Sequence, residues 1–340
     1  MLRRRRTVII TIGILFSIAV CLSTYLYRQD REDRKAKRSV KIKKHTVRDH
    51  IDSSIHDSFY VHQFDRKSPE QTKIASDHNP ENNAVNTFYY QKLKSAPCVP
   101  FQTWRGMIKI CTHDPKQDTM ISAFVHEFAT WEQDFLNATG DILTKNQQIT
   151  FVDLGCNIGV YTLFAAKLGI PVVSVDIFDK NLALLSKSLE INSLKENVTL
   201  VHNAISDERQ NVTIEVVENN IGGSYVKPLK TDRMSRQIII GSIFLDDLIP
   251  LIKTKDVFVK MDIEGTELKA LKAAKNFFQT VNVKGILMEW VLHKNNPSGK
   301  EIIKIMVDNG LMPYWDHQQL VPLKIGGYTY WPENVFWIKR

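Results

Sequence analysis

The fold of this 340-residue chain is decided by one stretch, Phe151-Val-Asp153-Leu-Gly155-Cys-Asn157-Ile-Gly159-Val-Tyr161-Thr162. It predicts a buried strand that ends in an acid, then a turn with two glycines, then a helix. Glycine is needed where a backbone turns tightly and comes close to a ligand. The spacing differs from Gly-x-Gly-x-x-Gly, so the diphosphate cradle of a dinucleotide enzyme is not reproduced. The acid at the strand end suits a ligand with a cationic amino acid portion.

Strands and helices are predicted to alternate on both sides of this stretch. Such alternation predicts an α/β fold with a mostly parallel sheet and helices on both faces. The expected strands are 101–104, 107–110, 149–154, 172–175, 198–201, 213–217, 238–243, 257–261 and 286–288, with a terminal hairpin from 328–331 and 335–338. The expected helices are 121–136, 160–168, 180–192, 267–278 and 301–308.

A second acid follows the next predicted strand. Asp176 comes 23 residues after Asp153. At this place in a Rossmann-like sheet an acid accepts hydrogen bonds from a ribose diol. A surface turn aspartate is the alternative, and the preceding glycine turn makes it the weaker one. The third strand leads to Asn203 and Ala204, where we expect contact with an adenine.

The third polar element is Lys260-Met-Asp262-Ile-Glu264-Gly265-Thr-Glu267. Its carboxylates gather at the end of a central strand, where ligands of open α/β sheets bind. Capping of the next helix explains one of them but not Asp262, which lies at the strand end itself. Glu289 follows the next strand, and His293 lies four residues later.

Together these residues resemble the FkbM family of S-adenosylmethionine-dependent methyltransferases. The similarity covers Asp-x-Gly-x-Asn-x-Gly, Leu245-Asp246-Asp247, Lys-x-Asp-x-Glu-Gly-x-Glu and a strand ending in Glu, over about residues 120–300. The chain departs from the family where the second strand ends in Asp176-Ile177 instead of Glu-Pro, and where Cys156 replaces the commoner Ala. The resemblance implies a Rossmann-like class I methyltransferase domain. It implies that S-adenosylmethionine binds to Asp153, Gly155, Asn157, Gly159, Asp176, Asn203 and Ala204.

The resemblance also implies methylation of a hydroxyl, often on a sugar or a natural product. The acceptor oxygen must then lie in line with the methyl group, roughly 3–3.5 Å away, and lose its proton. Asp262 is the first candidate as general base or polar anchor, followed by Glu289 and His293. A divalent metal held by Asp262 and Glu289 is a lesser alternative, and we expect no metal site.

Two other classes of protein remain open. A nicotinamide-dependent oxidoreductase would share the sheet, but the third glycine of its turn and a suitable Tyr-x-x-x-Lys pair are missing. A catalytically inactive binding or scaffold protein would share every element of the fold. Retention of Asp153, Asp176, Asp262 and Glu289 in one chain argues against such decay.

The N-terminal part predicts a membrane anchor. Residues 1–6 form a short basic tail, and residues 7–27 are uncharged and apolar over 21 positions. At ~1.5 Å per residue this run spans the bilayer core, and it is longer than the apolar core of a cleaved signal peptide. Residues 28–95 are polar and predict a stem, and 96–340 the catalytic domain with its core at 120–300. We therefore expect a single-pass signal-anchor protein.

Charge and cysteines bear on partners and location. Residues 1–50 hold 14 of the 45 Lys and Arg and 4 of the 37 Asp and Glu, so the other 290 residues carry a net charge of 31 − 33 = −2. The domain therefore lacks the basic surface that nucleic-acid binding needs. The four N-terminal arginines favour a cytosolic N-terminus, but the seven Lys and Arg in residues 28–42 make the positive-inside rule lean slightly the other way. Cys98 and Cys111 form either a disulfide or two buried thiols. From the cysteines and the resemblance we expect a luminal domain in the Golgi or endoplasmic reticulum, acting on a glycan or small-molecule hydroxyl.

Overall fold

A computed structural model describes residues 61–63, 96–228, 238–318 and 321–339. All described residues belong to one compact unit within His56–Arg340. The predicted membrane span at 7–27 lies outside the described residues. Within the part of the chain that is described, no helix is both long and apolar enough to cross a bilayer.

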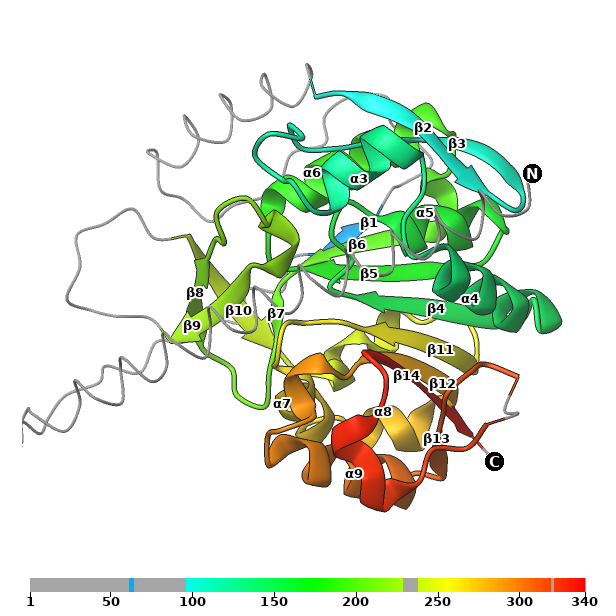
Figure 1. Ribbon diagram of the computed structural model, residues 1–340, viewed down its shortest axis with the longest axis vertical. Coiled ribbons are helices and arrows are strands. Elements are labelled where there is room, and N and C mark those ends of the chain that lie inside the picture. The colour runs from blue at the N-terminus through cyan, green and yellow to red at the C-terminus, as the bar shows by residue number, and fades with distance from the viewer. Residues whose placement is uncertain (1–60, 64–95, 229–237, 319–320, 340) are drawn as a thin grey trace, which may run out of the picture. The chain divides into compact units, whose positions relative to one another are not determined.

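The centre of the unit is an eight-stranded sheet, as Figure 1 shows. Five consecutive strands of this sheet are parallel, which confirms the predicted strand–helix alternation. A strand from residues 334–339 pairs antiparallel with the last of them, and the two edge strands of the sheet also pair antiparallel with their neighbours. The spatial order is β1 (Val61–Gln63), β6 (Val198–His202), β5 (Val172–Asp176), β4 (Ile149–Leu154), β11 (Asp256–Met261), β12 (Asn282–Glu289), β14 (Asn334–Lys339) and β13 (Leu311–Tyr314).

Helices cover both faces of the sheet. Successive residues of a strand point to opposite faces, so each face presents apolar side chains that a layer of helices can bury. On one face Phe151 and Phe258 pack against α4 (Gln133–Lys145), α5 (Val160–Lys167) and α6 (Asp179–Ile191). On the other face Val152 and Val259 pack against α7 (Glu267–Lys272), α8 (Lys275–Thr280) and α9 (Ser298–Asp308). The sheet is therefore the middle layer of three (Figure 1).

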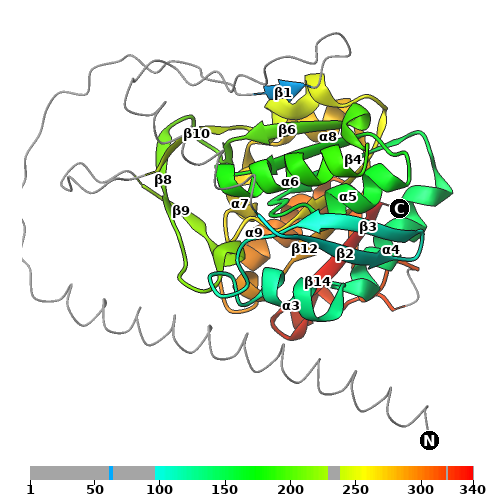
Figure 2. The same cartoon turned by 90° about the horizontal axis from the view of Figure 1, so that it is seen from above.

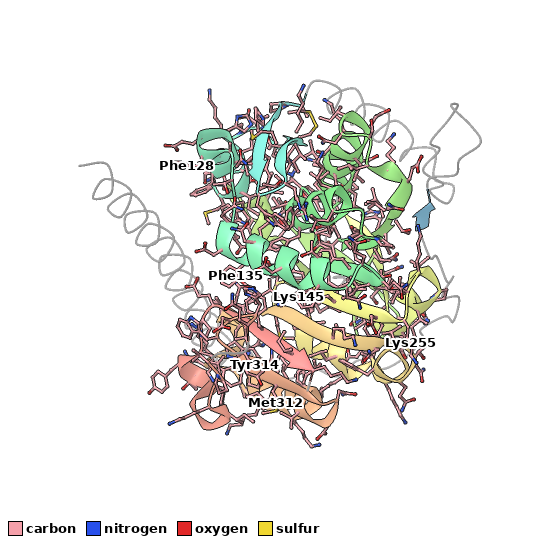
Figure 3. The ribbon with its side chains drawn as sticks, turned by 90° about the vertical axis from the view of Figure 1, so that its right-hand side faces the viewer. Phe128, Phe135, Lys145, Lys255, Met312 and Tyr314 are labelled. Carbon is pink, nitrogen blue, oxygen red and sulfur yellow. A yellow bond between two sulfur atoms is a disulfide. The ribbon has the colours of Figure 1, made fainter. Side chains whose placement is uncertain are left out.

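A disulfide-closed hairpin lies outside α6. It consists of β2 (Cys98–Thr103) and β3 (Gly106–Cys111), and Figure 2 shows it on the side of α6 that faces away from the sheet. Cys98 and Cys111 are directly opposite in register and form a disulfide, which is visible near the strand ends in Figure 3. The Asn192 side chain accepts from the Lys109 N–H and donates to its carbonyl, which fixes the hairpin to α6.

A second, smaller sheet follows the edge at which the parallel strands end (Figure 1). Its order is β7 (Ala204–Ile205), β10 (Ile239–Ile243), β8 (Asn211–Glu215) and β9 (Tyr225–Pro228). Short 3-10 turns complete the unit at Lys195–Asn197, Ile221–Gly223, Leu245–Leu251, Val291–His293 and Ile325–Tyr330. We call the strand-end edge of the large sheet the carboxyl edge.

Two predicted helices are interrupted in the structure. The helix expected at 121–136 is α3 (Ile121–Phe128) followed by α4, because Ala129 and Glu132 adopt left-handed backbone angles with φ of 54° and 44°. A helix cannot continue through such residues. The helix expected at 267–278 likewise consists of α7 and α8, which are separated by Ala273 and Ala274.

The predicted terminal hairpin was wrong in its first strand. Residues 328–330 lie in a 3-10 turn, and the partner of β14 on this side is β13. Pro313 lies inside β13, and proline is tolerated there because β13 is the edge strand of the sheet. The predicted stem also contains one ordered element, since β1 pairs antiparallel with β6.

Candidate active site

One face of the large sheet carries a row of polar side chains near the carboxyl edge. Asp153 on β4 pairs in register with Ser174 on β5 and with Lys260 on β11. Residues in register on parallel strands point to the same side, so these three side chains share a face. All three are buried in an otherwise apolar sheet. A buried charge is costly without partners, so this row marks a site and not ordinary core.

Asp153 is fully buried, and one of its oxygens has no partner among the described residues. Its Oδ2 accepts a hydrogen bond of 2.6 Å from the Thr162 hydroxyl, which lies 2.7 Å from the Ser174 hydroxyl. Its Oδ1 is enclosed without a hydrogen bond. Burial raises the pKa of Asp153, and the nearby Lys260 charge opposes this rise. An enclosed acceptor of this kind fits a ligand that brings its own donor.

Lys260 is the single cation of this row. Its Nζ lies 3.1 Å from Asp262 Oδ2 and 5.1 Å from the centre of the Tyr161 ring. The Tyr161 hydroxyl in turn donates to Glu132 Oε2 over 2.8 Å. Burial lowers the pKa of Lys260, but the Asp262, Asp153 and Glu132 charges outweigh burial and raise it. The surrounding carboxylates therefore favour the ammonium form of Lys260.

Gly155 and Gly159 have backbone angles that favour glycine, with φ of 77° and 91°. A Cβ at Gly155 would lie 1.8 Å from the backbone oxygen of Asp262, so the turn after β4 touches the end of β11. A Cβ at Gly159 would lie 2.2 Å from Leu185 Cδ1, so this glycine lets α5 approach α6. Both glycines were predicted to bind a cofactor, and the structure shows that each also meets a packing requirement of the fold.

Asp176 and Asn157 are joined at the same turn. The Asn157 N–H donates to Asp176 Oδ2 over 2.7 Å, and Asn157 adopts a left-handed φ of 51°. Asp176 Oδ1 accepts from the Phe178 N–H and from the Asn181 side chain. Burial raises the pKa of Asp176 to about 6, although these hydrogen bonds favour its ionised form. Gly222 from the small sheet's loop closes over the Asn157 amide, since a Cβ there would lie 2.6 Å from Asn157 Nδ2.

Asn203 and Ala204 lie where the third strand leads into the small sheet. Both are buried, and the Asn203 side chain donates to the Gly241 carbonyl over 3.1 Å. Its Oδ1 is enclosed without a partner within the described part of the chain. Asn203 therefore repeats the feature seen at Asp153, an enclosed acceptor at the end of a parallel strand.

Glu289 is the last residue of β12, and His293 follows this strand. β12 lies beside β11, on the side away from β4. Burial, followed by the charges of Asp262, Glu264 and Glu267, raises the pKa of Glu289 well above its ordinary range. His293 is buried, with Nε2 at 3.0 Å from Glu267 Oε2 and Nδ1 at 2.8 Å from the Ser298 hydroxyl. Both ring nitrogens of His293 thus have partners in the folded chain, and its role as a base stays a prediction.

The order of strands, the antiparallel β14 beside β12, and the acids after β4 and β5 define a Rossmann-like class I methyltransferase. Residues 153–311 match the family model described as the methyltransferase FkbM domain. Residues 153–311 are therefore identified as an FkbM-type methyltransferase domain, as the sequence predicted, and S-adenosylmethionine is the methyl donor. No curated protein matches the chain.

Several solved structures are similar to this chain at low identity. Precorrin-6y C5,15-methyltransferase from Geobacter metallireducens GS-15 is 13% identical, with a TM-score of 0.35 over 63% of this chain and 93% of that one. A TehB-like SAM-dependent methyltransferase from Corynebacterium glutamicum is 10% identical, with a TM-score of 0.35 over 64% and 94%. An rRNA methylase from Streptococcus thermophilus is 15% identical, with a TM-score of 0.33 over 59% and 93%. Scores this low carry no argument, and the assignment rests on the family model.

The residues at the carboxyl edge fit the methyl donor. S-adenosylmethionine carries a methyl group on a positively charged sulfur, and its amino group, ribose hydroxyls and adenine amino group are donors that need acceptors. The enclosed oxygens of Asp153 and Asn203 are such acceptors. Among the described residues, no group of three or more His, Cys, Asp and Glu side chains is placed to hold a metal ion.

Three residues of the site were missed as contributors or given little weight. Lys260 was quoted only as part of a motif and Tyr161 only as part of the turn, and Glu132 lies within the helix expected at 121–136. The one signal for Lys260 is a charged residue inside the buried stretch 257–261. Nothing local to Glu132 or Tyr161 predicts their contact, because 29 positions separate them along the chain.

Proposed function

We propose that this chain is an O-methyltransferase that methylates a hydroxyl of a glycan or glycolipid in the secretory pathway. The observation that carries the proposal is the position of two carboxylates. Asp262 and Glu289 lie at the ends of the neighbouring parallel strands β11 and β12, whose pairing runs up to Met261 and Met288. Asp262 also touches the glycine turn through its backbone oxygen. The acceptor-side acids are therefore next to the donor-side turn.

On the donor side, each predicted residue has a role that its geometry supports. The enclosed Oδ1 of Asp153 would accept from the amino group of the methyl donor. Asp176 Oδ2 accepts one backbone hydrogen bond and has a second lone pair for a ribose hydroxyl. Asn203, beside Ala204, would meet the adenine. The turn from Gly155 to Gly159, with Asn157 between them, sets the positions of these acids.

On the acceptor side, a hydroxyl must lose its proton as it accepts the methyl group. Asp262 is about one-third exposed, at 34% of its side-chain surface, so an incoming hydroxyl could reach its carboxylate. Glu289 is a second candidate base. Its pKa is raised toward neutral pH, and a general base is most effective when its pKa lies near the working pH. His293 would act through its contact with Glu267, or as a base after a change of partner.

The disulfide supports a luminal domain. Disulfides persist in oxidising compartments and are rare in the cytosol, and Cys98 and Cys111 are bonded across the hairpin. The uncharged run at 7–27 supplies the anchor in this proposal, and the polar segment 28–95 the stem. A luminal, anchored methyltransferase would meet glycans and glycolipids as its most abundant sources of hydroxyl groups.

The test uses the full chain in detergent with deuterated-methyl S-adenosylmethionine. Purified protein is incubated with a glycolipid fraction, a protein-linked glycan fraction and a set of phenols, and products are identified by mass spectrometry. Label in an oxygen-linked methyl of a sugar supports the proposal. Label only in phenols, or on nitrogen or carbon, would exclude a glycan hydroxyl. Cofactor binding without transfer to any fraction would favour the binding protein considered as an alternative.

A further inference from the structure

The charged groups around Lys260 come from every element that meets at this point of the sheet. Tyr161 lies under the ammonium from α5, and Glu132 lies at the start of α4. Lys260 is the only cation that the described contacts place among these acids, and its side chain is 9% exposed. The titratable groups that face it are Asp153 from β4, Asp262 after β11, Glu289 from β12, Glu132 and Tyr161.

The position of Lys260 is fixed from two directions. Asp262 Oδ2 binds the ammonium at 3.1 Å, and the Tyr161 ring lies beneath it at 5.1 Å. The Tyr161 hydroxyl is held by Glu132, whose left-handed φ of 44° is unusual for a long side chain. Such a backbone is strained, and strain of this kind clusters at functional sites. Glu264, after Asp262, has a φ of 55° and adds a second case at the same edge.

We infer that Lys260 is a positioning residue for methyl transfer: held by Tyr161 and Glu132, its ammonium fixes the Asp262 carboxylate at the carboxyl edge, facing the acceptor. This inference rests on the proposed function, since it gives Asp262 its place in the reaction. Lys260 does not itself exchange a proton or a methyl group. Its charge offsets part of the repulsion among the surrounding carboxylates, which would otherwise move Asp262 outward into solvent.

Lys260→Met tests this inference, because methionine keeps much of the side-chain length and removes the charge. Lys284→Met is the matched control. Lys284 lies on the neighbouring strand β12 and binds Asp256 at 3.3 Å, at the opposite end of the sheet. In the full chain, we expect Lys260→Met to lower kcat at least about tenfold. The dissociation constant of S-adenosylmethionine, measured by calorimetry, should change less than about threefold. Lys260→Arg should restore most of kcat, and Lys284→Met should leave it unchanged.

A second readout does not depend on turnover. The Lys260 charge lowers the pKa of Glu289, so in Lys260→Met the Glu289 carboxyl should titrate at higher pH than in the wild type. Carbon-13 NMR of chain labelled at the glutamate carboxyls measures this, with Glu289→Gln assigning the signal. The acidic limb of the pH–rate profile should shift upward in the same variant. Tyr161→Phe, which keeps the ring and loses the bond to Glu132, should lower kcat by a smaller factor.

The outcomes separate this inference from the proposed function. If wild type methylates a glycan and Lys260→Met does so at the same rate as Lys284→Met, the inference is wrong and the function stands. If Lys260→Met and Lys260→Arg both lose cofactor binding, Lys260 acts on the donor or on folding, and the inference is also overturned. If wild type binds the cofactor but methylates nothing, the proposed function fails. If, in addition, Glu289 titrates at the same pH in Lys260→Met as in wild type, the charge coupling between Lys260 and Glu289 is overturned as well.

Discussion

The backbone oxygen of Asp262 occupies the place where a side chain at Gly155 would begin. The distance from an added Cβ to that oxygen is 1.8 Å, well inside any allowed contact. The turn that follows β4 and the end of β11 are therefore in direct backbone contact. Because of this contact, a displacement of the Gly155 turn should also displace the backbone of Asp262.

Substitution of Gly155 should therefore affect folding as well as cofactor binding. Gly155→Ala combines left-handed backbone strain, on the order of 1–2 kcal/mol, with this clash. Gly169→Ala is the matched control, because Gly169 has a similar φ of 81° but nothing within 4 Å of an added Cβ. We expect the thermal midpoint to fall clearly further for Gly155→Ala than for Gly169→Ala. Equal midpoints would show that the contact relaxes at little cost.

Asp262→Asn should reduce turnover and preserve cofactor binding. The amide keeps the shape of the carboxylate but cannot take a proton, so we expect kcat to fall about 100-fold or more. Asp256→Asn, at the amino end of the same strand, should retain wild-type kcat at a temperature at which it is folded. The measurement is methyl transfer at saturating donor. Wild-type turnover by Asp262→Asn would remove Asp262 from the reaction.

The affinity for S-adenosylmethionine should weaken as the pH falls through about 6. Burial raises the pKa of Asp176 to about 6, so its carboxylate gains a proton below that pH and loses an acceptor for the ribose. Calorimetric titrations at pH 5 and pH 7.5 measure the change. In Asp176→Asn the affinity should be lower overall and should vary less between these two pH values.

The raised pKa of Asp176 also determines how the free energy of unfolding should change with pH. Because the folded pKa of Asp176 lies above its unfolded value of roughly 3.9, the folded state holds the proton more tightly between about pH 4 and pH 6. The contribution of Asp176 to stability is therefore fully present below pH 4 and is lost as the pH rises through 6. Compared with Asp176→Asn, wild type should lose unfolding free energy over this interval. Parallel curves for the two proteins would contradict the shift.

Reduction of the Cys98–Cys111 disulfide should lower the stability of the described unit. The bond closes a short loop with a sequence separation of 13, for which a loss of about 2–4 kcal/mol is typical. Thermal unfolding with and without reductant measures the effect, and Cys98→Ser/Cys111→Ser should match the reduced wild type. Cys156→Ala is the control for the free buried thiol. Reductant should lower the thermal stability of this variant as much as that of wild type.

Much of the fold was predictable because it is written in local patterns. The sequence correctly predicted the β-branched strands, the helix that follows the glycine turn, and the acids at the strand ends. β13 escaped because it has four residues and contains Pro313, which ordinarily argues against a strand. The break between α3 and α4 was not predicted, because Ala129 and Glu132 give no sequence signal for a left-handed backbone.

The site was predictable in its acids and not in its contacts. Asp153, Asp176 and Asp262 follow strands and so were expected at one edge. The bond between Tyr161 and Glu132, and the position of Lys260 over Tyr161, depend on how α4, α5 and β11 pack together. Exposed apolar side chains such as Phe128, labelled in Figure 3, likewise acquire their surroundings only in three dimensions.

The antiparallel strand β14 has a consequence for synthesis of the chain. It contains residues 334–339, yet it is inserted between β12 and β13, which are made earlier. Until β14 has been made, this edge of β12 is bare and β13 lacks the strand with which it pairs. Completion of this side of the sheet therefore waits for β14, and deletion of residues 334–339 would also remove the strand partner of β13.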